Sequence, residues 1–174
     1  MGFFRVDLFA DDEGRRFVVH CWPREFRSTQ DPAWTVHCHA WPVESMILTG
    51  RLRDTQFVHE AADERIPPGV LYLAGSAPDG MSELKRTGEA VRLAGSVDAY
   101  REEREFYEIG LDAFHESVVG ARGHCMTLAR IGRRKVQPAR VVGEPGAPAL
   151  LRYHHEAVAR QLLRDEFRAA GLTT

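Results

Sequence analysis

The sequence lacks the features that mark disulfide-rich, membrane-spanning or nucleic-acid-binding proteins. Among its 174 residues only 3 are cysteines, so the chain offers no framework of paired disulfides. No uninterrupted apolar run approaches the roughly 20 residues that a membrane-spanning helix needs. Because 23 Lys and Arg face 25 Asp and Glu, the formal net charge is only -2. This balance predicts no bulk attraction to nucleic acids or anionic membranes.

Sequence motifs for several common chemistries are also missing. The chain has no phosphate-binding loop, no G-x-G-x-x-G turn, no G-x-S-x-G elbow and no Cys-x-x-Cys pair. The N-terminal segment carries Asp7, Asp11, Asp12 and Glu13, which is not typical of a secretory signal. Together with the odd cysteine count, this leads us to expect a cytoplasmic protein. A composition of 44% hydrophobic and 28% charged residues is that of a folded domain.

Short apolar and β-branched segments, separated by Gly and Pro, fill most of the chain. Such regular punctuation predicts an all-β sandwich or barrel over residues 1–147. The expected strands cover residues 17–22, 34–39, 45–49, 55–59, 70–73, 105–109, 113–119, 125–131 and 136–142. The polar stretch 76–103 is expected to be a long excursion between strands.

The spacing of apolar residues changes at Pro148, after which they recur at helical spacing. The pattern predicts an amphipathic C-terminal helix over 148–174, packed against the β domain so that the chain forms a single domain. A helix that binds a partner protein is the alternative. The residues that carry the pattern are Leu150, Leu151, Tyr153, Val158, Leu162, Leu163 and Phe167.

Residues 37–50 contain the most informative pattern, which begins with two histidines separated by one residue. Residues two apart on a strand point to the same face, so His37 and His39 are expected to project together while Cys38 faces the other way. Two such imidazoles can share a metal ion, at about 2.0–2.1 Å for zinc. The following Trp41-Pro42 turn is expected to bring Glu44 toward the same pocket as a carboxylate ligand.

His37, His39, Glu44 and Gly50 follow the first motif of the cupin superfamily, G-x5-H-x-H-x3/4-E-x6-G. Four residues separate His39 from Glu44, five precede Gly50, and Gln30-Asp31 stands where the leading Gly falls. Over residues 30–135 the chain thus resembles the cupins, most closely the small thiol-dioxygenase-like members. The resemblance implies a double-stranded β-helix (jelly-roll) barrel around one divalent metal ion. It favours Fe(II), with Zn, Mn or Ni as alternatives.

The second cupin motif supplies a further histidine ligand. Its best counterpart here, residues 110–115, keeps only the histidine, so the resemblance implies His115 as the third ligand. His124 is the rival, but it follows the turn residues Gly120 to Gly123 and is expected nearer the surface. Whether Glu44 binds the metal directly stays open, because a carboxylate can also orient a ligand histidine.

These residues favour a mononuclear non-haem Fe(II) dioxygenase or oxygenase that acts on a small molecule. A redox-neutral isomerase or lyase and a non-enzymatic ligand-binding cupin are the alternatives. Glu44 and Tyr107 are the candidate catalytic residues, and Tyr107 is expected beside the metal with other pocket-wall residues. These are Trp34, Trp41, Met46 and Phe114. We also expect a homodimer through the apolar N-terminal residues Phe3, Phe4, Val6, Leu8 and Phe9.

Overall fold

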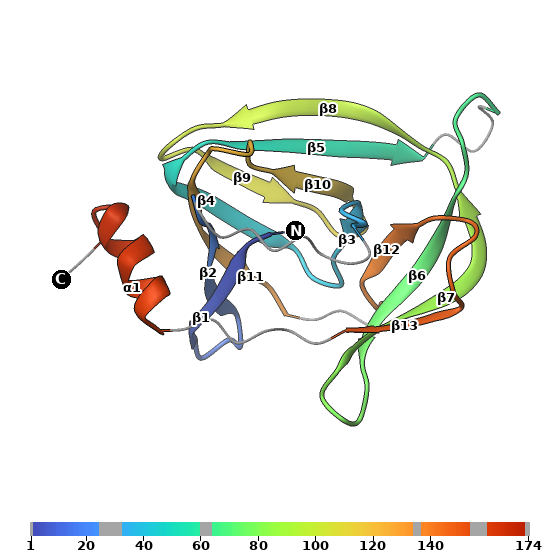
Figure 1. The fold of residues 1–174 in the computed structure, drawn as a ribbon, viewed down its shortest axis with the longest axis horizontal. Coiled ribbons are helices and arrows are strands. Elements are labelled where there is room, and N and C mark those ends of the chain that lie inside the picture. The colour runs from blue at the N-terminus through green and yellow to red at the C-terminus, as the bar shows by residue number, and fades with distance from the viewer. Residues whose placement is uncertain (1, 25–32, 60–63, 134–136, 154–159, 173–174) are drawn as a thin grey trace.

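The computed structural model describes residues 2–24, 33–59, 64–133, 137–153 and 160–172 (Figure 1). Within them the chain is built from antiparallel strands and a short helix at the C-terminal end. The elements in chain order are β1 (Phe4–Ala10), β2 (Arg16–Trp22), β3 (His37–Cys38), β4 (Val43–Gly50), β5 (Leu52–His59), β6 (Gly69–Ser76), β7 (Ser82–Val91), β8 (Leu93–Arg101), β9 (Phe106–Ile109), β10 (Phe114–Val118), β11 (Cys125–Ile131), β12 (Arg140–Gly143), β13 (Leu150–Tyr153) and α1 (Arg160–Ala169).

The strands form two sheets, and the prediction of a mostly β protein is confirmed. The five-stranded sheet has the order β1-β2-β11-β4-β9. The eight-stranded sheet has the order β13-β7-β6-β12-β3-β10-β5-β8. Neither sheet closes on itself within the described residues. In Figure 1 the two sheets enclose an interior, with β3 beside it and α1 outside the five-stranded sheet.

The core lies mainly on the inner face of the five-stranded sheet. On β2, Val18 and Trp22 face this core, and on β4 the inward residues are Val43 and Ile47. Because side chains alternate along a strand, the residues between them face outward. Two further clusters lie against the eight-stranded sheet, one around Cys38, Leu71 and Phe114 and the other around Val70, Tyr72 and Leu84. The burial of apolar side chains in these clusters fixes the position of β3 between β10 and β12.

Two sequence predictions about secondary structure are wrong. Residues 76–103 contain the whole of β7 and β8, which pair with other strands of the eight-stranded sheet, instead of an irregular excursion. Their many polar residues are compatible with strands because β7 extends to the rim of the sheet, where residues Lys85 to Ala90 are exposed. Strand pairing supplies the backbone hydrogen bonds there, so apolar residues are not needed.

The expected C-terminal helix is also shorter than its apolar pattern suggests. Residues 150–153 form β13, which pairs with β7 through Leu151 opposite Leu84 and Tyr153 opposite Ser82. This pairing buries backbone groups at the edge of the sheet and outweighs the local helical spacing. The helix α1 covers only Arg160–Ala169, and none of its residues is fully buried. Val158 lies outside the described residues.

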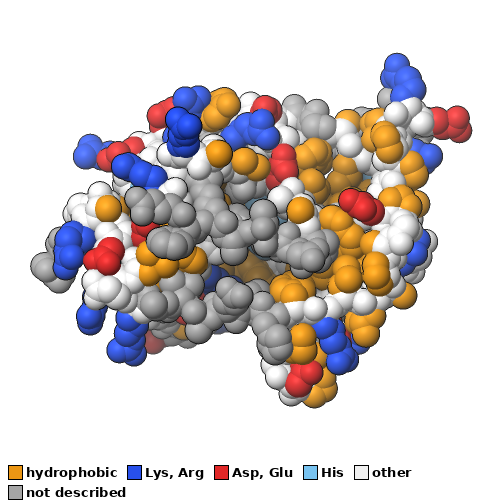
Figure 2. All heavy atoms as spheres, viewed as in Figure 1, with side chains coloured by type: hydrophobic (Ala, Val, Ile, Leu, Met, Phe, Trp, Pro, Cys, Tyr) orange, Lys and Arg blue, Asp and Glu red, His pale blue; other side chains and the backbone are white. Residues whose placement is uncertain are grey.

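The outer surface includes an exposed strand edge at β1 and an apolar region. The strand β1 is an edge strand, where Leu8 and Phe9 are 47% and 60% exposed, while Phe3 packs against the core. Figure 2 shows hydrophobic side chains gathered over β6, β7 and β12, with charged groups mostly around the periphery. In the described part of the chain, no helix has the length and apolar character that crossing a membrane would require.

Candidate metal centre

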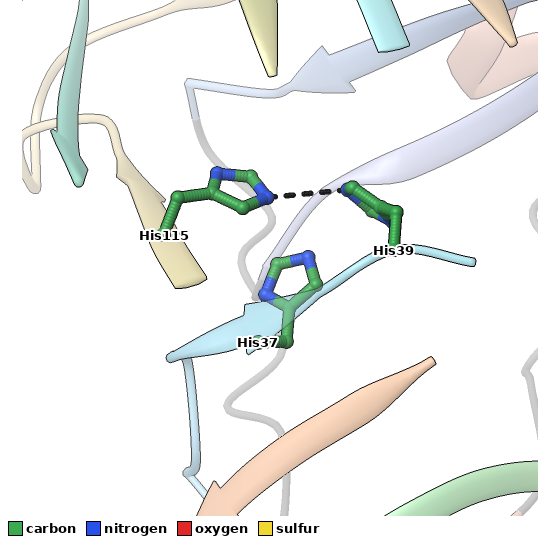
Figure 3. Close-up of side chains that lie close together, drawn as sticks. All are labelled: His37, His39 and His115. Atoms are coloured by element: carbon green, nitrogen blue, oxygen red, sulfur yellow. Dashed lines mark hydrogen bonds between the residues drawn. The ribbon is translucent and has the colours of Figure 1, made fainter. Parts of the chain in front are cut away.

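Three imidazoles come together inside the molecule, from His37, His39 and His115 (Figure 3). One ring nitrogen of each lies within 4.8 Å of the others. The ring centroids are 4.5 Å apart for His37 and His115, 4.8 Å for His37 and His39, and 5.1 Å for His39 and His115. His39 and His115 approach through their Nε2 atoms, 3.2 Å apart. The structure therefore brings together all three histidines that the sequence indicated.

Strand pairing explains why these residues meet. His37 on β3 is directly opposite His115 on β10, so their side chains share a face of the eight-stranded sheet. His39 follows β3 at the i+2 position and points the same way, while Cys38 faces the apolar cluster on the other side. The Trp41 ring stacks beside His39, with centroids 6.1 Å apart and an interplanar angle of 24°. This contact holds His39 where the chain turns toward β4.

The groups around Nδ1 of His37 and His115 determine whether Nε2 of each ring is free to bind a metal. His37 Nδ1 lies 2.8 Å from the carbonyl oxygen of Thr35, which can only accept, so Nδ1 carries the proton and Nε2 has the lone pair. His115 Nδ1 lies 3.6 Å from Oδ1 of the buried Asp54. A small movement would make this a hydrogen bond and leave His115 Nε2 unprotonated. Both rings then present Nε2 as a ligand atom.

Burial keeps His37 and His39 neutral, which a metal ligand requires. It lowers the pKa of His37 to about 4, and the neighbouring His115 lowers that pKa further. Burial also lowers the pKa of His39 well below its usual range, and the nearby His37 and His115 add to the effect. At neutral pH His37 and His39 are therefore uncharged. A metal ion can bind them without first displacing the extra proton of an imidazolium.

The distances and the unsatisfied groups fit a divalent transition metal. Two metal–nitrogen bonds of about 2.1 Å that meet at roughly 100° span 3.2 Å, which is the separation of the His39 and His115 Nε2 atoms. His115 Nδ1 and both carboxylate oxygens of Asp54 are buried without a hydrogen-bond partner within the described residues. A metal ion on His115 would draw these groups together, because it makes the Nδ1 proton a stronger donor.

The expected carboxylate ligand, Glu44, is not brought to the imidazoles. It lies on β4 between Val43 and Ser45, both buried on the inner face, so its side chain points to the opposite face. There it is 45% exposed and pairs with Arg130 of the neighbouring strand β11. The turn at Trp41-Pro42 thus returns the chain to the interior. The strand that follows directs Val43 and Ser45 inward, so Glu44 points outward.

The second candidate catalytic residue, Tyr107, is part of the inner core of the five-stranded sheet. It is 8% exposed and lies opposite Ser45 on β4. Burial raises the pKa of Tyr107 above its usual range, and the nearby Ser45 hydroxyl partly opposes this effect. The Arg101 guanidinium lies 5.4 Å from the centroid of the Tyr107 ring and 3.7 Å from Asp54. Arg101 and Asp54 thus lie between Tyr107 and His115.

The other residues expected near the metal divide between the site and the rest of the core. Trp41 contacts His39, whereas Trp34 packs against Tyr72 with centroids 4.8 Å apart. Phe114 faces away from His115 into the cluster around Cys38. His124, the rival third ligand, is not in the group of three and lies 3.2 Å from Glu166 of α1. Its side chain is 11% exposed and contacts α1, away from the three imidazoles.

Three further residues belong to the site but were not indicated by the sequence. Asp54 lies 3.6 Å from His115 Nδ1, and the Thr35 carbonyl oxygen accepts a hydrogen bond from His37 Nδ1. His20 on β2 shares the inner face with Val18 and Trp22, and its Nδ1 lies 3.5 Å from Thr127 Oγ1. The expected strand began at Thr55, which placed Asp54 in a turn. Extending that strand back to Leu52 would have put Asp54 on the same face as Gln56.

A cavity of about 290 Å³ lies close to β3 but on its other side. Its walls include Val36, Phe57, Leu93 and Val142. These residues belong with Cys38 to the apolar cluster that His37 faces away from. The cavity is therefore distinct from the space around the three imidazoles.

Comparison with known proteins found no family model and no curated protein that matches the chain.

Replacing Asp54 with asparagine should weaken metal binding at the three-histidine site about 10–100-fold, because loss of a carboxylate behind a ligand histidine typically has this effect. Asparagine keeps the size of Asp54 but cannot stabilise the positive charge that a metal gives to His115. Competition with a chelator of known affinity would measure the change. Asp98→Asn is the matched control, since Asp98 is 59% exposed and pairs with Arg53. Equal loss in both variants would contradict a specific role for Asp54.

Acidification should destabilise the metal-free protein before its carboxylates titrate. Burial lowers the pKa of both His20 and His37 to about 4, against about 6.5 in an unfolded chain. Their contribution to the free energy of unfolding is complete above about pH 6.5 and is lost as the pH falls toward 4, by up to about 1.4 kcal/mol per pH unit for each. Urea unfolding between about pH 7 and 5 would measure the slope. It should be shallower in His20→Gln, and an unchanged slope would contradict the prediction.

Proposed function

We propose that this chain is a mononuclear metal-dependent enzyme with a cupin-like jelly-roll fold, in which His37, His39 and His115 hold Fe(II) for an oxygenase reaction on a small molecule. The observation that carries the proposal is the convergence of three imidazoles, two of which direct Nδ1 at Thr35 and Asp54. Oriented, unprotonated imidazoles of this kind are suited to a divalent transition metal.

The ligand set favours a reactive site over a purely structural one. Structural zinc sites have four protein ligands, whereas three leave positions open. When bound by three imidazoles, Fe(II) supplies coordination positions at which O₂ and a substrate can bind. The structure offers no fourth ligand in this group within the described residues, since Glu44 pairs with Arg130 on the outer face.

The charge of the site favours an anionic substrate. The neutral His37 and His39 bring no negative charge, so a buried divalent ion would keep a net positive charge even with the Asp54 carboxylate behind His115. A substrate thiolate or carboxylate would neutralise part of this charge. Trp41 Nε1, next to His39, is a buried donor without a partner among the described residues, and it could bind an acceptor of such a substrate.

The protein itself would position the reacting groups and limit water. Asp54 lies 3.6 Å behind the His115 ring, Thr35 accepts a hydrogen bond from His37, and Trp41 stacks beside His39. Tyr107 and Glu44 do not contact the imidazoles, so we assign them no direct part in proton transfer. His20 is the nearest additional imidazole on the opposite sheet and is neutral at pH 7 because burial lowers its pKa.

The experiment is metal analysis followed by a test for open coordination positions. Protein purified without a histidine tag, stripped and reconstituted anaerobically with Fe(II), should bind iron and give the high-spin iron–nitrosyl EPR signal when nitric oxide is added as an O₂ substitute. His59→Ala, which removes an exposed histidine on β5 away from the ligand set, should behave like the wild type. Iron that gives no nitrosyl signal would contradict an oxygenase and favour redox-neutral chemistry. Failure to bind iron, zinc, manganese or nickel would contradict an enzyme with this metal centre.

We also propose that two copies associate through β1, whose outer edge is unpaired within the described residues. Replacing Leu8 and Phe9 with lysine should convert a dimer into a monomer at tens of micromolar, as measured by light scattering during size exclusion. Phe106→Lys is the control, because Phe106 is 74% exposed on β9 at the other end of the same sheet. A wild-type monomer would contradict the proposal.

A further inference from the structure

A second group of potential metal ligands lies on the outer side of the five-stranded sheet. It consists of Cys21 on β2, His124 immediately before β11 and Glu166 on α1. One ligand atom of each lies within 4.8 Å of the other two, and His124 Nε2 is 3.2 Å from a Glu166 carboxylate oxygen. Figure 1 shows α1 beside this sheet, outside the interior that holds the first site. Three segments far apart in sequence therefore converge here.

The three side chains are shielded from solvent and separated from the first site by the sheet itself. Cys21 is 0% exposed and alternates with His20 and Trp22, which face inward, so its thiol is directed outward. The side chains of His124 and Glu166 are 11% and 12% exposed. Burial of a thiol, an imidazole and a carboxylate together is unfavourable unless the charges are compensated.

The backbone holds two of these ligands in place. Cys21 lies on β2, which is paired on both sides, with Phe4 of β1 and Met126 of β11. The carbonyl oxygen of His124 lies so close to Gly50 that a Cβ atom there would be only 1.9 Å away. Gly50 also has a φ of +81°, which favours glycine. The chain around His124 is thus fixed by close packing, even though it follows a glycine-rich turn.

We propose that Cys21, His124 and Glu166 form a second transition-metal site, suited to Zn²⁺, that fastens α1 to the outer face of the five-stranded sheet. Thiolate sulfur, imidazole nitrogen and carboxylate oxygen are the donors that zinc binds in proteins. Zinc–nitrogen and zinc–oxygen bonds of about 2.1 Å meeting at roughly 100° span the observed 3.2 Å between His124 and Glu166. Three protein ligands leave a fourth position for water.

A bound metal ion would explain why the Cys21 thiol is buried beside the His124–Glu166 pair. Burial raises the pKa of Cys21 to about 12, and the negative charge of Glu166 adds to this effect, so the metal-free side chain is a thiol. Zinc binding forms the Zn–S bond and releases the thiol proton to solvent, which leaves a thiolate and a carboxylate against a divalent cation. The helix α1 has no fully buried residue, so a metal bond would add an attachment that apolar packing does not provide.

Cobalt(II) substitution tests this site separately from the first. In the His37→Ala/His39→Ala variant, which lacks two ligands of the first site, Co²⁺ should bind at one per chain. It should also produce the near-ultraviolet charge-transfer band of a cobalt–thiolate bond. Cys21→Ala in the same background should abolish the band, whereas Cys38→Ala and Cys125→Ala, which remove other buried cysteines, should keep it. His124→Ala and Glu166→Gln should each weaken Co²⁺ binding by at least tenfold.

A second measurement follows the attachment of the helix. Zn²⁺ should raise the midpoint of thermal unfolding of the His37→Ala/His39→Ala variant, and it should do so less or not at all when Cys21 is also replaced by alanine. Absence of the cobalt–thiolate band, or its persistence in Cys21→Ala, would overturn the proposal. His124 and Glu166 would then form an ion pair beside a buried thiol.

Discussion

Replacing His37 and His39 together with alanine should reduce the Fe(II) bound at the three-histidine centre to background. Only His115 would remain of the three imidazoles that converge there. Structural zinc sites with four ligands bind with about 10–16 kcal/mol, so each ligand accounts for about 3–4 kcal/mol, or roughly 10²–10³-fold in affinity. Loss of two ligands should therefore prevent stoichiometric binding at micromolar metal. Iron analysis after anaerobic reconstitution and desalting would measure it.

The variant should still fold, because the buried apolar clusters do not include the imidazoles. The inner core is built from residues such as Val18, Ile47 and Leu52, and two further clusters support the eight-stranded sheet. Far-ultraviolet circular dichroism would show whether the strands persist. Cys21→Ala as a common background removes the proposed second site, so that the iron count reports the first site alone. A folded double variant with wild-type iron content would contradict the site assignment.

The best predicted strands are those whose two faces are both buried. Strands β2 and β11 lie within the five-stranded sheet, and nearly every residue between Val18 and Trp22 is apolar or weakly polar. Such short runs of β-branched and apolar residues are typical of buried strands, so the sequence located them within one or two residues. In contrast, β7 is exposed over much of its length, and its polar residues carry no period of two that a sequence pattern could detect.

The histidine pair was predictable because a single residue separates the two histidines in one short segment at β3. The i, i+2 spacing alone determines that His37 and His39 share a face, whatever the rest of the fold. Asp54 was not predictable in this way, since its role depends on β5 pairing with β10, a contact between residues about 60 positions apart in the chain. Glu44 illustrates the opposite difficulty. Its spacing after His39 matches a motif, but a one-residue difference in register directs Val43 and Ser45 inward instead.

The choice between His115 and His124 as third ligand gives the other large expected effect. His115→Ala should weaken Fe(II) binding at the first site by roughly 10²–10³-fold, because it removes one of three ligands. His124→Ala should leave that affinity within about twofold, since the two histidines belong to different groups of potential ligands. Both variants should be made in the Cys21→Ala background and compared by competition with an iron chelator.

The physical reason for this asymmetry is the direction in which each strand presents its side chains. His115 lies opposite His37 across the β3–β10 pair, so the inner face of the eight-stranded sheet holds its ring beside the other two. His124 precedes β11 in the five-stranded sheet, and its imidazole reaches Glu166 on the outer helix. For His124 to become the third ligand, this segment would have to leave its contact with Gly50 and carry the ring through the sheet. A larger loss of iron affinity in His124→Ala than in His115→Ala would therefore contradict both the ligand assignment and the strand order that places β10, not the turn before β11, beside β3.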